Sequence, residues 1–179
     1  MDPKQAVLSP RQAAKAKYRS ARSNLLLALC FTVVNMVLHV LGTNSYLLFS
    51  ITAPFFATVF AIESYYAVVT ALFAGVAVIS LALYFLCWLF SKKHPAWMTV
   101  ALVLFCLDTV ILAGIFLLAE EISGILDALA HIWVLYYLIV GVKNAALLKK
   151  LPPEEENEAA APAVKAAAAP AEHKDPWER

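Results

Sequence analysis

The chain has 179 residues, of which 62% are hydrophobic and only 15% are charged, and its mean hydropathy is +0.73. This composition excludes an ordinary soluble domain, and the near-neutral formal charge of +1 hides a strong local segregation of charge. The charged residues lie mainly in the first 22 residues, in short links and after Lys143. The sequence therefore predicts an all-α integral membrane protein.

Residues 1–22 form a basic N-terminal flank. Ser9 and Pro10 are typical of a helix start, with Ser as the N-cap and Pro at the first helical position, so we expect a helix from about residue 10. By the positive-inside rule, this flank is cytoplasmic and contacts the anionic headgroups of the lipid bilayer. Because a membrane flank carries such charges in any case, no nucleic-acid partner is expected. Its basic residues are Lys4, Arg11, Lys15, Lys17, Arg19 and Arg22, against one acid, Asp2.

Four apolar runs are long enough to cross a bilayer, because about 20 helical residues cover its hydrocarbon core. The basic region is too long for a secretory signal and no small-x-small cleavage site follows the first apolar run, so this run should remain in the mature protein. In the second run, Ala67, Ala71 and Gly75 recur at four-residue spacing and predict close helix packing. We expect a four-helix bundle in a membrane domain of residues 23–150, with spans at about 23–41, 66–90, 96–118 and 122–142.

The stretch at residues 46–62 is apolar but interrupted by Pro54. A full crossing here would place Lys92 and Lys93 on the opposite side from the other basic clusters, against the positive-inside rule. We therefore expect an extra outer-leaflet segment, either two short helical legs that re-enter or a Pro-started interfacial helix. With four crossings, both termini lie in the cytoplasm, most simply at a bacterial cytoplasmic membrane. Residues 151–179 are rich in Glu, Ala and Pro and are predicted to be a disordered cytoplasmic tail.

The three cysteines, Cys30, Cys87 and Cys106, stand singly within apolar runs. Without a CxxC pair, they are typical of small buried side chains rather than of disulfides or metal ligands. No cofactor is predicted from them.

Polar side chains cluster in the outer half of the predicted bundle, which is the most informative pattern in the sequence. Asp127 and His131 are four residues apart and share a helix face, as do Asn35 and His39 in the first span. Ionisable groups at this depth are costly and usually face protein or water. The candidate cluster comprises Asn35, His39, Glu63, Asp108, Asp127 and His131.

Several chemistries are compatible with this cluster. His39, Asp127 and His131 form a weak candidate metal set, although no HExxH motif accompanies them. His39 and His131 also raise the possibility of b-type haem ligation, and the His and Asp groups that of a proton relay or polar-substrate site. The alternative is structural: the groups satisfy one another and hold the helices together.

No nucleophile stands beside a base and no Gly-rich phosphate loop occurs, so enzyme activity is not expected. The first functional hypothesis is a non-enzymatic scaffold, accessory subunit or sensor that contacts a partner membrane protein or forms a homo-oligomer. The alternative is a small transporter or permease-like protein that uses the Asp/His cluster for a proton, a cation or a polar substrate.

Overall fold

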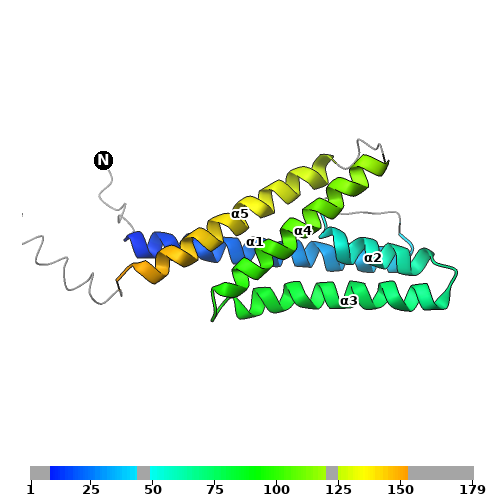
Figure 1. Cartoon of the computed structure of the whole chain (residues 1–179), viewed down its shortest axis with the longest axis horizontal. Helices are drawn as coiled ribbons and strands as arrows, with labels where there is room; N and C mark the ends of the chain where they lie inside the picture. The colour runs from blue at the N-terminus through cyan, green and yellow to red at the C-terminus, as the bar shows by residue number, and fades with distance from the viewer. Residues whose placement is uncertain (1–8, 44–48, 120–124, 153–179) are drawn as a thin grey trace, which may run out of the picture.

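The computed structural model describes residues 9–43, 49–119 and 125–152. These residues form helices and no strand, and four of the helices are long and apolar enough to cross a membrane. The remaining helix has 12 residues and is too short to cross. The expected fold class, a four-span helical membrane protein with one extra short helical segment, is confirmed. The helices are α1 (Pro10–Val40), α2 (Thr52–Glu63), α3 (Ala67–Phe90), α4 (Ala96–Ala119) and α5 (Ile125–Lys150) (Figure 1).

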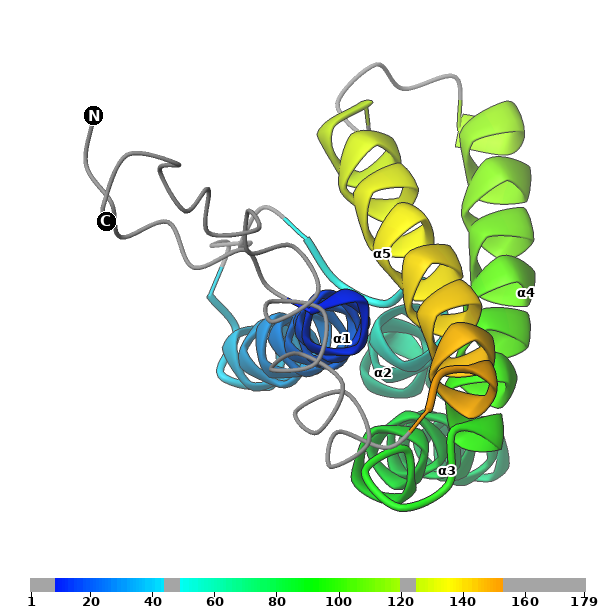
Figure 2. The same cartoon turned by 90° about the vertical axis from the view of Figure 1, so that its left-hand side faces the viewer.

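The long helices alternate in direction along one axis of the molecule. Toward one end, α4 and α5 diverge from α1 and α3, and α2 lies between them (Figure 1). The end-on view likewise places α2 among the long helices, and it contacts α1, α3 and α4 (Figure 2). The opposite end carries the α3–α4 turn with Lys92 and the C-terminal part of α5, and is called the basic end below.

Helix α1 joins the basic flank and the first predicted span into one continuous helix of 31 residues. It begins where the sequence indicates, because Ser9 Oγ accepts a hydrogen bond from the Gln12 amide at 3.2 Å. In return, Gln12 Oε1 accepts from the Ser9 amide at 3.3 Å, which completes a capping box. After α1, Gly42 takes a positive φ of 69°, a conformation that glycine adopts without a steric penalty.

At the basic end, side chains of α1 satisfy the C-terminal carbonyl groups of other helices. Arg22 donates to Ser91 Oγ at 2.9 Å and to the Trp88 carbonyl at 3.2 Å, and Tyr18 Oη donates to the Ser91 carbonyl at 2.6 Å. These bonds stabilise the end of α3, whose last carbonyl groups have no partner within the helix. Part of the basic flank therefore forms hydrogen bonds within the protein.

Helix α5 continues past the expected end of its span to Lys150, and Arg11 holds its terminus. The Arg11 guanidinium donates to the carbonyl groups of Leu151 and Pro152 at 2.6 and 2.8 Å. The predicted tail lies outside the described residues beyond Pro152. Helices α1 and α5 are thus joined at the basic end by hydrogen bonds as well as by packing.

Helices α1 and α5 approach each other closely at Gly141, a site that the sequence did not predict. A Cβ atom placed on Gly141 of α5 would lie 2.6 Å from Ala21 Cβ of α1, well inside van der Waals contact. By contrast, a Cβ placed on Gly75 meets nothing within 4 Å, and Ala67 and Ala71 are exposed. The expectation that the α3 stripe mediates close packing within this chain is therefore wrong, and Gly141 has that role.

The cysteines differ in their environments although all three are free. Cys87 is buried as expected, whereas Cys30 and Cys106 lie on the exposed surface of the bundle. For these two, the expectation of burial within the protein is wrong, because an apolar run that faces lipid has the same composition as one that faces protein.

In the described part of the segment that follows α1, residues 49–63, a single helix enters the bundle. Residues 49–51 are non-helical, and α2 begins at Thr52 with Pro54 in its first turn. Thr32 and Asp108, which contact this start, lie near the middle of the apolar parts of α1 and α4. The N-terminus of α2 therefore lies deep in the bundle, where water is not available to its backbone.

Candidate functional site

The buried start of α2 is capped by a carboxylate from another helix. Asp108 of α4 accepts hydrogen bonds from the Thr52 amide at Oδ2, at 2.9 Å, and from the Ala53 amide at Oδ1, at 2.7 Å. The N-cap residue of α2 is Ile51, whose side chain offers no acceptor. Asp108 thus supplies the oxygen atoms that a Ser, Thr, Asp or Asn N-cap would normally supply.

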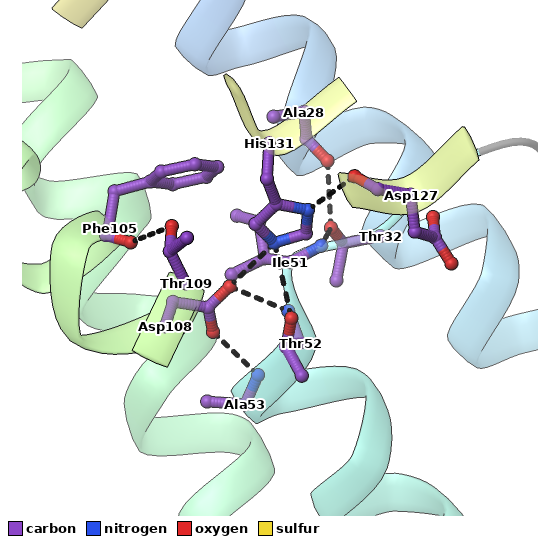
Figure 3. Close-up of polar contacts among 10 residues, drawn as sticks. All are labelled: Ala28, Thr32, Ile51, Thr52, Ala53, Phe105, Asp108, Thr109, Asp127 and His131. Atoms are coloured by element: carbon purple, nitrogen blue, oxygen red, sulfur yellow. Dashed lines mark hydrogen bonds and ion pairs between the residues drawn. The ribbon is translucent and has the colours of Figure 1, made fainter. Parts of the chain in front are cut away.

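Every backbone donor at this helix start has a partner. A helix leaves its first four N–H groups without partners inside the helix, here those of residues 51–54. The Ile51 amide donates to Thr32 Oγ1 at 2.8 Å, and Pro54 has no N–H group. With Thr52 and Ala53 bound by Asp108, the three N–H groups present all have partners, as Figure 3 shows. We call Thr32, Asp108 and His131 the α2 clasp.

His131 of α5 completes the clasp. Its Nδ1 lies 2.9 Å from the Asp127 carbonyl oxygen, so Nδ1 carries a proton and donates it to that oxygen. Its Nε2 lies 3.1 Å from Asp108 Oδ2 and 3.1 Å from Thr52 Oγ1.

The side chains of the clasp are almost fully buried. Asp108 and His131 are each 1% exposed and Thr52 is 2% exposed. The rings of Phe49 and Phe105 lie 5.0 and 5.1 Å from the imidazole, measured between ring centroids. In these apolar surroundings hydrogen bonds to a charged group are strong, and the positive end of the α2 dipole favours a carboxylate at this position.

The other candidate residues are only partly brought together. Asn35 is buried, and its Nδ2 donates to the Phe49 carbonyl at 3.0 Å, which fixes the non-helical leg before α2. His39 lies farther along α1, packs edge-on against Phe55, and has a buried Nε2 without a hydrogen-bond partner among the described residues. Glu63 is exposed at the end of α2.

Asp127 and His131 do share a helix face, but not through their side chains. The imidazole contacts the backbone carbonyl group of Asp127, whereas the Asp127 carboxylate points away from the ring (Figure 3). The carboxylate that His131 meets belongs to Asp108, 23 residues earlier in the chain. The i,i+4 spacing thus identified His131 as a site residue, but the acid whose side chain it contacts is Asp108 and not Asp127.

Comparison with known families places this architecture. The sequence profile of the Yip1 domain matches residues 4–152, a range that includes all five helices and the whole clasp. The chain belongs to the Yip1 domain family. This is a family of membrane domains, in agreement with the four long apolar helices. No curated protein and no solved structure matches the chain.

The described part of this Yip1 domain contains no group of three or more His, Cys, Asp or Glu side chains close enough to bind a metal ion. The three candidate metal ligands from the sequence, His39, Asp127 and His131, do not converge on one point. His39 packs on Phe55 in one direction, the Asp127 carboxylate points away, and His131 uses both ring nitrogens within the clasp. The arrangement favours helix anchoring over metal or haem ligation.

One residue of the clasp, Thr32, and one residue that the clasp holds, Thr52, were not among the predicted site residues. Thr32 and Thr52 act through hydroxyl groups that ordinary membrane helices also carry, so their type gave no signal. A signal existed nevertheless in Pro54. A proline in the first turn indicates a helix start within an apolar segment, and such a start needs a buried acceptor.

Proposed function

We propose that this Yip1 domain is a non-enzymatic component of the membrane, a scaffold, accessory subunit or sensor that acts through contacts with partner proteins. The observation that supports this role is the use of its buried ionisable pair. Both oxygen atoms of Asp108 and both nitrogen atoms of His131 are bonded within the protein. The pair holds α2 in place, and its polar atoms are fully used. Such a role requires a partner, either another membrane protein or a second copy of this chain.

The transporter hypothesis rests on one observation. A cavity of about 130 Å³ lies beside Asp108 and is bordered by Ala53, Ser80 and Tyr84 together with aliphatic side chains. Proton or cation transport would require Asp108 to exchange its partners for water or substrate. Its present partners include two backbone amides, whose positions are fixed by α2, so this exchange would require α2 to move.

A flux measurement separates the two hypotheses. Liposomes that contain the purified protein should show the same dissipation of a pH or potassium gradient as protein-free liposomes. The Asp108→Asn variant should behave identically in this assay. A gradient that collapses faster with the wild-type protein, and at the control rate with Asp108→Asn, would establish transport and refute the scaffold proposal.

We also propose that both termini lie in the cytoplasm and that the membrane is a bacterial cytoplasmic membrane. The support is the charge distribution. All ten Lys and Arg among the described residues lie at the basic end, whereas the acids Glu63, Asp108 and Asp127 lie elsewhere. By the positive-inside rule, this asymmetry makes the basic end cytoplasmic.

Cysteine labelling in intact cells tests this orientation. In a background without the native cysteines, a membrane-impermeant maleimide should label Thr43→Cys and Glu63→Cys from outside. It should label Lys93→Cys only after the membrane is opened. Labelling of Lys93→Cys in intact cells would contradict the proposed orientation.

A further inference from the structure

A groove between α1 and α5 begins at the basic end and runs toward the middle of the bundle. It consists of two hollows, of about 250 and 290 Å³, lined by side chains of the same two helices with Phe49 at the deep end. The hollows adjoin where Tyr137 of the first contacts Trp133 of the second, with ring centroids 5.9 Å apart. At this point Trp133 Nε1 donates to Asn24 Oδ1 at 3.2 Å and joins the two walls of the groove. We call the pair of hollows the α1–α5 groove. Its α1 wall is formed by Lys17, Ser20, Asn24, Leu27, Ala28 and Phe31.

The mouth of the groove is cationic and rich in hydrogen-bond donors. Lys17 and Lys143 line it together with Ser20, Asn144 and Tyr136, and its lining contains no carboxylate. The described acids lie far along the bundle from this mouth, so no nearby negative charge among the described residues neutralises the lysines. A negatively charged group is the ligand that such a mouth attracts.

The lysines differ from the arginines of the same end in how they are used. Arg11 and Arg22 donate to backbone carbonyl groups, and the Arg22 guanidinium also lies 5.7 Å from the Trp88 ring centroid. Those two cations therefore stabilise helix ends. Lys17 and Lys143 instead border a hollow, and a lysine ammonium binds phosphate as a flexible point charge.

Beyond the mouth the groove becomes apolar. Its second hollow exposes almost only carbon atoms, from side chains such as Leu27, Phe31 and Val134. From Lys17 to Phe31 the α1 wall is about 21 Å long at ~1.5 Å per residue, which exceeds the ~15 Å depth of one leaflet. Trp133 and Tyr136 lie on the exposed side of α5, beside the two hollows.

We propose that the α1–α5 groove binds one anionic glycerophospholipid from the leaflet at the basic end. The phosphate lies between Lys17 and Lys143 and accepts hydrogen bonds from the neighbouring hydroxyl and amide groups. One acyl chain lies along the apolar hollow against Leu27 and Val134. This binding site is independent of the α2 clasp and does not rest on the scaffold proposal.

Native mass spectrometry of the full-length protein in uncharged detergent tests the proposal. Phosphatidylglycerol should bind more tightly than phosphatidylcholine with the same acyl chains. The Lys17→Gln/Lys143→Gln variant should bind phosphatidylglycerol about 30-fold more weakly, given about 1 kcal/mol for each lysine near an anionic lipid. The matched control is Lys92→Gln/Lys93→Gln, which removes the same charge from the same end away from the groove and should bind as the wild type does.

The acyl part of the site has its own test. Ala130→Trp fills the apolar hollow from the α5 side and should weaken phosphatidylglycerol binding while the lysines remain. Leu27→Trp fills it from the α1 side and replaces the first variant if that one does not fold. Glycerol 3-phosphate, which has no acyl chains, should not compete at the lipid concentrations used.

Four results would overturn the proposal. The first is equal affinity for the two phospholipids, and the second is an equal loss in the Lys92→Gln/Lys93→Gln control, which would indicate general surface attraction. The third is wild-type affinity in the folded filling variants. The fourth is effective competition by glycerol 3-phosphate, which would indicate a phosphate site without a chain.

Discussion

Replacement of Asp108 by alanine should lower the free energy of unfolding by about 3 kcal/mol, because two buried N–H donors would lose their acceptors at a cost of roughly 1–3 kcal/mol each. Those donors are the amides of Thr52 and Ala53, and the side chains of Thr52 and Asp108 beside them are 2% and 1% exposed. His131 would also lose its carboxyl partner. Unfolding in mixed micelles with increasing dodecyl sulfate measures the change.

The adjacent residue provides the control for Asp108. Thr109 lies on the same helix at the same depth, and its hydroxyl donates to the Phe105 carbonyl of its own helix at 2.8 Å. Thr109→Ala should therefore change stability little. Asp108→Asn should fall between the wild type and Asp108→Ala, because an amide keeps one acceptor oxygen but turns its NH₂ group toward another donor. Equal stability of Asp108→Ala and Thr109→Ala would refute the capping role.

Replacement of Gly141 by alanine should cost about 2 kcal/mol, within the range typical of overpacked cores. The new methyl group would lie 2.6 Å from Ala21 Cβ, and neither atom is at the end of a flexible side chain. The α1 and α5 backbones would have to separate, and Met98, whose Cγ lies 3.4 Å from the added Cβ, would have to shift. The same unfolding titration measures the loss.

Two further variants identify the cause of that loss. Gly114→Ala adds the same methyl group where nothing lies within 4 Å, and it should be neutral or slightly stabilising because alanine favours helix. Ala21→Gly should restore most of the stability of Gly141→Ala by removing the opposing methyl group. A loss that Ala21→Gly does not relieve would contradict steric contact as the cause.

The helices of this Yip1 domain follow from local chemistry, and that is why they could be predicted. The four spans follow from the length of the apolar runs, and the start of α1 follows from Ser9 and Pro10. The close contact at Gly141 could not be predicted in the same way. It depends on which faces of α1 and α5 meet, and the regular Ala67 and Gly75 spacing on α3 was the stronger local pattern.

The position of the polar cluster along the helices could be predicted from the sequence, but the hydrogen-bond partners of its members could not. Counting residues along each helix from its outer end predicted that Asn35, Asp108 and His131 lie at a similar depth. In the structure, these side chains contact α2 or the segment that leads into it. Which acid meets His131 depends on how α4 and α5 cross. Asp108 and His131 are 23 residues apart in the sequence. An i,i+4 pattern such as Asp127 and His131 describes neighbours on one helix only and cannot predict this contact.

The clasp also imposes an order on biogenesis. When the segment before α2 leaves the ribosome, α1 has already been synthesised, so Thr32 Oγ1 is available to accept the hydrogen bond from the Ile51 amide. The Thr52 and Ala53 amides need Asp108, which is synthesised 56 and 55 residues later. Bare amides in hydrocarbon cost several kcal/mol each, so a nascent chain that ends before α4 keeps this segment at the aqueous boundary. The short helix therefore enters the bilayer only after α4, which is translated later, has been made.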